Sequence, residues 1–187
     1  TPLVVRTPMG GGRGYGPTHS QSLERLFFGI PHLKLVAASH VHDAGALLRQ
    51  AVADPEPVIF VENKLLYPQP LLLEGQPGEL WRDERPDAFG YSTALLHNAP
   101  PSLAPDVTIV AYGGMSRLLA PLLAELAAEE IRVVACLPGC ISPLDMAPIA
   151  ECAAASGRVL VVEESQAAFG WGAEVAARLH ALVGREL

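Results

Sequence analysis

The chain has 187 residues, of which 50% are hydrophobic and 18% are charged, so we expect a globular and not a disordered protein. Its formal net charge of −7 argues against nucleic acid as the main partner. No apolar run long enough to span a membrane occurs, and three cysteines fit a reducing compartment, so we expect a cytoplasmic protein.

A glycine-rich stretch near the start is the most distinctive feature of the sequence. Residues 2–6 predict a buried strand, and residues 7–18 predict a loop that holds five glycines. Thr18 and Gln21 fit a capping box, which predicts a helix over residues 19–29. His19 would then face the positive end of the helix dipole, which disfavours the imidazolium form. The alternative is a long surface loop whose histidine only contacts water.

The remainder of the first third predicts alternating strands and helices. Residues 33–37 and 58–62 predict strands, and the second is the continuous apolar kind found in parallel sheets. Residues 43–52 predict a helix with Ala44, Leu47, Leu48 and Ala51 on its apolar face. The turn at residues 54–57 follows from its two prolines.

The middle of the chain has a different character from its flanks. Residues 63–104 hold six prolines and the charged patch 82–85, which predict a linker or an arm packed on another surface. From Asp106 a strand–helix alternation predicts a parallel sheet with helices on its faces. The predicted strands are 106–112, 131–137 and 158–163, and the predicted helices are roughly 115–128, 144–154 and 172–183.

Several other residues are of types that bind metals or phosphate, but their patterns favour structural roles. Residues 112–116 and 170–172 lie where phosphate-binding turns occur, but a tight turn is the expected interpretation of both. Cys136 and Cys140 lack a second ligand pair, so we expect buried thiols and not a zinc site. The cluster His32, His40 and His42 is expected to be solvated or capping. Residues 163–164, both Glu, end a strand and are left unassigned.

An ordered set of short motifs runs along almost the whole chain except the middle. The motifs are Arg6-Thr7-Pro8, His19-Ser20-Gln21-Ser22, residues 31–36, Asp43-Ala44, residues 57–62, residues 106–113, Pro143-Leu144-Asp145 and residues 169–174. Taken in order, they resemble the β subunit (E1β) of thiamine-diphosphate-dependent 2-oxo acid dehydrogenases, within the transketolase-like group.

The resemblance implies an α/β fold of parallel sheets flanked by helices. It divides the chain into a partial pyrimidine-binding-type domain at 1–62, a linker at 63–104 and a transketolase C-terminal-type domain at 105–187. The family's N-terminal domain begins before the matched region, and its last strand region follows it. We therefore expect an internal piece of a longer polypeptide or one part of a split enzyme.

The resemblance also implies a cofactor and partners. In the family an α subunit carries the Mg²⁺ and diphosphate site for thiamine diphosphate, and the glutamate that activates the cofactor precedes the region matched here. The residue matching His19 lines the active site, so His19 is the expected catalytic residue. Expected partners are an α-type E1 subunit, a second β chain, and a lipoyl-bearing E2 or an acyl carrier protein.

A potassium site is a further expectation. The last carbonyls of a helix lack intrahelical partners and carry the negative end of its dipole, which suits a large, weakly hydrated cation. The resemblance implies potassium at the end of the helix over residues 43–52, and the alternative is a helix end capped by water. The matching positions are Leu3, Ala51, Val52, Asp54 and Glu56.

Departures from the family pattern leave the reaction open. Residues 136–141 and 153–157 differ from the usual family runs. They leave room for a transketolase-like component that delivers a two-carbon unit to a carrier protein. A non-catalytic assembly module is the alternative of another class.

Overall fold

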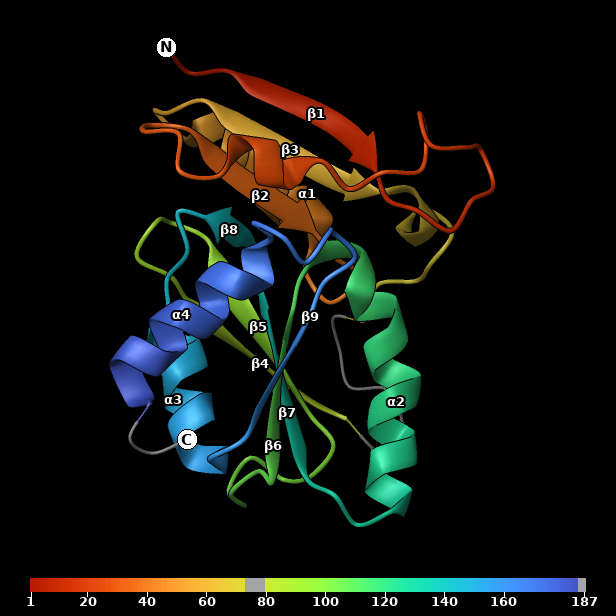
Figure 1. Ribbon diagram of the computed structural model, residues 1–187, viewed down its shortest axis with the longest axis vertical. Coiled ribbons are helices and arrows are strands. Elements are labelled where there is room, and N and C mark those ends of the chain that lie inside the picture. The colour runs from red at the N-terminus through yellow and green to blue at the C-terminus, as the bar shows by residue number, and fades with distance from the viewer. Residues whose placement is uncertain (73–79, 185–187) are drawn as a thin grey trace.

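The computed structural model describes residues 1–72 and 80–184, which form two sheets and their covering helices (Figure 1). The strands are β1 Val4–Met9, β2 Lys34–Ala38, β3 Val58–Asn63, β4 Trp81–Pro86, β5 Ser92–His97, β6 Val107–Ala111, β7 Val133–Pro138, β8 Cys140–Ser142 and β9 Val159–Val162. The α-helices are α1 Ala44–Ala53, α2 Ser116–Ala128, α3 Ala147–Ser156 and α4 Trp171–Val183, and the short 3₁₀ helices are η1 Glu24–Phe27, η2 Lys64–Leu66 and η3 Gly113–Met115.

The first sheet has the strand order β1-β3-β2-β8. Its first three strands are parallel, as the continuous apolar sequence of β3 predicts, whereas β8 runs antiparallel to β2. The expectation of a buried first strand is wrong, because β1 lies at the edge of the sheet and has no buried residue. Since β8 comes from the C-terminal half of the chain, it joins the two halves through backbone pairing. Helix α1 begins after Asp43, whose carboxylate accepts a hydrogen bond from the Ala46 backbone N–H at 2.9 Å.

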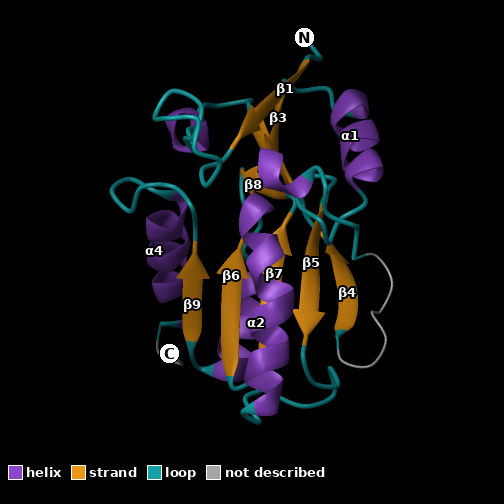
Figure 2. Cartoon of the chain, turned by 90° about the vertical axis from the view of Figure 1, so that its right-hand side faces the viewer, coloured by secondary structure: helices purple, strands orange, loops and turns teal. Residues whose placement is uncertain are grey.

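The second sheet has the strand order β4-β5-β7-β6-β9. Strands β7, β6 and β9 are parallel, and the hairpin β4–β5 is antiparallel and pairs with β7. Helix α2 covers one face of this sheet, and α3 and α4 cover the other (Figures 1 and 2). None of the helices in the described part of the chain has the length and apolar character needed to cross a bilayer.

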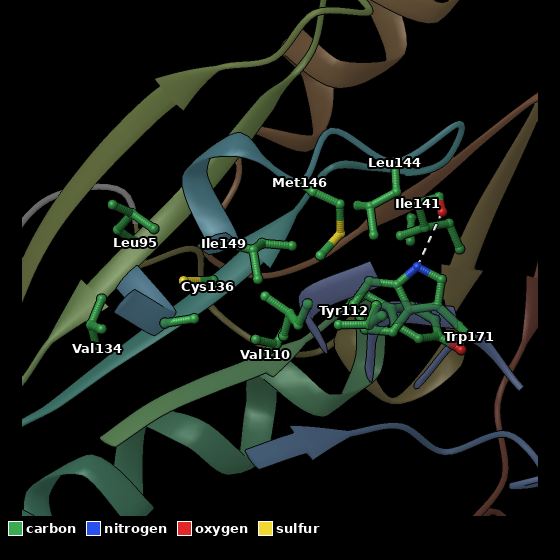
Figure 3. Packing of buried hydrophobic residues seen from close by; sticks show 14 of the residues in the cluster. Leu95, Val110, Tyr112, Val134, Cys136, Ile141, Leu144, Met146, Ile149 and Trp171 are labelled. Atoms are coloured by element: carbon green, nitrogen blue, oxygen red, sulfur yellow. Dashed lines mark hydrogen bonds between the residues drawn. The ribbon is translucent and has the colours of Figure 1, made fainter. Parts of the chain in front are cut away.

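The core is continuous between the two sheets. One buried cluster includes Leu35 from β2 together with Tyr112 and Trp171 from the C-terminal half. Figure 3 shows the two aromatic rings together, edge to face, with centroids 4.9 Å apart. The indole N–H of Trp171 donates to the Ile141 carbonyl at 3.1 Å, so the core also satisfies this polar group.

The strand–helix alternation predicted from the sequence is confirmed, but the helix expected over residues 19–29 is wrong. Only η1 is helical there, and no helix begins after Thr18. The Gln21 side chain donates to the Pro17 carbonyl and does not close a capping box. Glycine, serine and histidine favour helix weakly, and contacts with the C-terminal half hold this segment in an irregular course.

The segment 63–104, expected to be a linker or an arm, contains two strands that the sequence did not predict. Strand β4 is a charged, largely exposed edge strand, so it shows no alternating apolar pattern. Strand β5 is buried because it lies between β4 and β7. Residues 73–79 of this segment lie outside the described residues, and the domain boundaries stay predictions.

Candidate functional site

The loop that carries His19 is closed at its base. The Gly10 backbone N–H donates to the Gln21 carbonyl at 3.0 Å. Between them Gly14 and Gly16 adopt positive φ values of 74° and 72°, which other residues rarely adopt. His19 is exposed, and its backbone carbonyl accepts from the Lys64 ammonium at 2.8 Å. His19 therefore lies on an outward-facing loop, and the helix-dipole argument for its neutral form is wrong.

A buried carboxylate lies where this loop meets the C-terminal half. Glu24 is 1% exposed and accepts a hydrogen bond from the Tyr112 hydroxyl. Burial raises the pKa of Glu24 above its ordinary value of 4.5, and the Tyr112 hydrogen bond offsets only part of this effect. The nearby carboxylates of Glu163 and Glu164 raise the pKa further.

A second carboxylate, Glu164, connects the two halves directly. One of its oxygens accepts from the Gly11 backbone N–H at 2.5 Å, and the other accepts from the Asn63 side-chain amide at 2.9 Å. Asn63 ends β3, and Glu164 follows β9, so both groups lie beyond the carboxyl ends of parallel strands. This edge is where open α/β sheets place their ligand sites.

The space enclosed between these groups is small. Its volume is about 20 Å³, enough for roughly one water molecule. Ser22, Glu24, Asn63, Tyr112 and Glu164 lie on its walls. A cavity of this size does not admit a cofactor.

The cavity between Glu24, Tyr112 and Glu164 does not fit thiamine diphosphate. The enclosed cavity is too small for it, and the carboxylates around the cavity would repel a diphosphate. The described residues contain no group of three or more His, Cys, Asp or Glu able to hold a metal ion.

At the expected potassium positions, two backbone carbonyls already have donors within the chain. The Leu3 carbonyl accepts from the Val58 N–H at 2.8 Å, and the Ala51 carbonyl accepts from the Asp54 N–H at 3.3 Å. Val52 is 66% exposed on the outer side of α1. The structure therefore brings these positions to the end of α1, as expected, but uses two of their carbonyls in the fold.

A fixed positive charge lies beside the same helix end. The Lys34 ammonium is 2.7 Å from the Asp54 carboxylate and 3.7 Å from that of Glu56. Although burial alone lowers it, the Asp54 hydrogen bond raises the pKa of Lys34. The Tyr91 hydroxyl also donates to Asp54, at 3.1 Å. Potassium at this position stays a prediction, and Lys34 is the cation that the structure shows there.

Two of the clustered histidines are buried, which the sequence did not predict. His40 pairs with the Ser116 hydroxyl at 2.7 Å, and His42 pairs with the Ser39 hydroxyl at 2.6 Å. Burial lowers the pKa of His42 to about 4, and the positive charge of Arg82 contributes to this shift. Exposed His32 contacts Glu56 at 2.9 Å, so only this member matches the expected solvated role. The expectation of buried Cys136 and Cys140 thiols is confirmed.

Comparisons with known proteins identify the two halves. The family described as "Transketolase, pyrimidine binding domain" matches residues 1–70, and "Transketolase, C-terminal domain" matches residues 101–186. The chain therefore carries portions of a transketolase pyrimidine-binding domain and of a transketolase C-terminal domain. A solved structure titled "Split gene transketolase, inactive beta4 tetramer" has the same fold, with a TM-score of 0.63, 21% identity and coverage of 95% of this chain and 53% of that one.

Curated relatives are β subunits. The chain is 36% identical over 165 residues to the "Acetoin:2,6-dichlorophenolindophenol oxidoreductase subunit beta" of Cupriavidus necator, covering 88% of this chain and 45% of that protein. It is 31% identical over 180 residues to the "Pyruvate dehydrogenase E1 component subunit beta" of Bacillus subtilis, covering 96% and 52%. The chain spans about half the length of the curated relatives it matches. The expected resemblance to E1β is thus confirmed.

Three residues of the candidate site were not predicted from the sequence. Glu24 lies in a largely apolar stretch of sequence that gives no sign of a site. Asn63 stands at the end of a strand, where a polar residue is common. Glu164 has one visible signal, since it follows a strand at the edge where α/β folds bind ligands. The contacts that bring these residues together span as many as 153 positions in the sequence, so no local pattern contains them.

Proposed function

We propose that this chain is the β-type component of a thiamine-diphosphate-dependent 2-oxo acid dehydrogenase that is active only with partner chains. The observation that carries the proposal is similarity to β subunits of such enzymes over 88% to 96% of the chain. The reaction would be decarboxylation of a 2-oxo acid and transfer of the acyl group to a lipoyl or carrier acceptor.

An α-type partner would supply the cofactor site. That partner would hold Mg²⁺ and the diphosphate, and thiamine diphosphate would there stabilise the carbanion formed on decarboxylation. This chain would associate with a second β chain and with the α-type chain. A lipoyl-bearing E2 or an acyl carrier protein would accept the product.

His19 is the residue of this chain that we assign to proton transfer. Its imidazole is exposed on a loop whose base is closed, so it is accessible to a site completed by a partner. An imidazole can both give and accept a proton at a ring nitrogen. The role of His19 would be to exchange a proton with the substrate-derived group or with the acyl acceptor.

The test is to reconstitute the chain with its α-type partner and to compare His19→Ala with wild type. We expect kcat to fall about 10²–10⁴-fold, the range typical for loss of one acid–base group, with unchanged cofactor affinity. His32→Ala is the matched control, because His32 is an exposed histidine in the same half. Unchanged turnover with a natural acceptor would remove His19 from the mechanism.

A purely structural role is the second candidate, and the small volume of the cavity between Glu24, Tyr112 and Glu164, about 20 Å³, favours it. Under this hypothesis the chain would bind its partners without catalysis. Stable assembly with an α-type chain and thiamine diphosphate, without 2-oxo acid decarboxylation, would support the assembly module against the enzyme component.

A further inference from the structure

The glycine-rich loop is attached to the C-terminal half near both of its ends. At its start, the Gly11 N–H donates to Glu164. After its end, the Tyr112 hydroxyl donates to Glu24, and the Arg25 guanidinium donates to the Ala168 carbonyl at 3.3 Å. Two of these attachments lie on the segment between β9 and α4. This segment therefore controls where the loop lies.

Glu164 is the attachment that uses both carboxylate oxygens. Its two partners, Gly11 and Asn63, belong to different strand ends of the first sheet. The side-chain oxygen Oδ1 of Asn63 accepts from the Leu65 backbone N–H at 3.0 Å, so the side-chain NH₂ group is turned toward Glu164. The Leu65 N–H thus fixes the orientation of the Asn63 amide. Each oxygen of the Glu164 carboxylate then accepts one hydrogen bond, one from Gly11 and one from Asn63.

The backbone of the loop is close to these side chains for a steric reason. A Cβ at position 11 would lie 3.0 Å from the nearer Glu164 oxygen, and a Cβ at position 10 would lie 2.4 Å from the Asn63 amide nitrogen. Gly10 also has a φ of 102°. Glycine at these two positions allows the backbone to reach the carboxylate and the amide.

We propose that Glu164 is a positioning residue that holds the His19 loop against the second half of the chain. Glu164 acts through the loop and contacts no reacting group. The catalytic consequence of this role rests on the proposed function of His19, whereas the control of loop order does not.

Loop order can be measured without any activity, because Arg13 is an exposed trypsin site inside the loop. We expect Glu164→Gln in the full chain to increase the rate of cleavage after Arg13 about tenfold, the effect of losing one charge-assisted hydrogen bond on a local opening equilibrium. In this variant the NH₂ group of the introduced glutamine would face the NH₂ group of Asn63, so the hydrogen bond between the two side chains would be lost. Glu174→Gln, a change on α4 outside these contacts, is the matched control and should leave the rate unchanged.

A reciprocal double variant tests whether the pair acts directly. When Asn63→Asp is combined with Glu164→Gln, the introduced amide can donate to the introduced carboxylate while its oxygen still accepts from Gly11. The slow cleavage rate should therefore return. Equal cleavage in wild type and Glu164→Gln would overturn the proposal. Fast cleavage in the double variant, with the folded state intact by circular dichroism, would also overturn it.

The reconstituted complex supplies the second readout. We expect Glu164→Gln to lower kcat without changing KM for the 2-oxo acid, and the double variant to restore kcat. A loosened loop with unchanged kcat would overturn the positioning role in catalysis. If the wild-type complex has no turnover, the proposed function fails, and the cleavage rates still decide whether Glu164 holds the loop.

Discussion

Glu24 and Tyr112 are 88 positions apart in the sequence, and the Tyr112 hydroxyl donates a hydrogen bond to the buried Glu24 carboxylate. The second Glu24 oxygen is buried without a hydrogen-bond partner among the described residues. Leaving a buried acceptor unpaired is unfavourable, and a buried carboxylate is more unfavourable when ionised. This contact therefore fixes the end of the glycine-rich loop but makes the fold sensitive to the protonation of Glu24.

The first prediction concerns the pH dependence of stability at Glu24. The raised folded-state pKa means that the contribution of this carboxyl to stability is present below about pH 4.5 and is lost as the pH rises through the folded-state value. Glu24→Gln should remove this dependence and raise the free energy of unfolding at neutral pH. Urea unfolding over that range measures it, and an unchanged pH slope in the variant would contradict the assignment.

The second prediction concerns His42, whose effect has the opposite sign. With a folded-state pKa of about 4, below its ordinary 6.5, His42 stays neutral in the fold, so stability is lost as the pH falls from 6.5 toward 4. The loss from this residue should be about 3 kcal/mol, since one pKa unit corresponds to about 1.4 kcal/mol. His42→Asn should flatten this part of the profile, whereas substitution of exposed His32 should not.

The third prediction concerns the buried pair of Lys34 and Asp54. Lys34→Met leaves the Asp54 carboxylate buried without its cation, so the free energy of unfolding should fall by about 3–5 kcal/mol. Adding Asp54→Asn should recover part of the loss, because it removes the unpaired charge. A decrease below about 1 kcal/mol in chemical unfolding would show that the pair behaves like a surface ion pair.

The fourth prediction concerns potassium at the end of α1. Thermal unfolding of the intact complex should be compared in potassium and in a bulky organic cation at equal ionic strength. An ion present at 100 times its Kd should add about 2.7 kcal/mol to the free energy of unfolding. Identical melting in both salts would leave Lys34 as the cation that neutralises this helix end.

Local sequence patterns are enough to establish the α/β class and the strand–helix alternation. The signal for these elements is local, because the apolar pattern that predicts β3 or α2 lies within one strand or a few helical turns. The same patterns predict the glycine-rich loop after the first strand, but they place His19 in the helix that was expected to follow that loop. The comparisons with known proteins confirmed the resemblance to E1β that the ordered motifs indicated.

The course of that loop and the residues that hold it depend instead on long-range packing. The capping pattern at Thr18 predicted a helix, but the contacts of Gly11 and Glu24 with the second half favour an irregular segment. The roles of Glu164 and Tyr112 depend on groups 153 and 88 positions away, so they exist only once the two halves pack. Local propensities amount to tenths of a kcal/mol per residue, whereas a buried charged hydrogen bond contributes about 1.5–3 kcal/mol, and the long-range contacts therefore prevail.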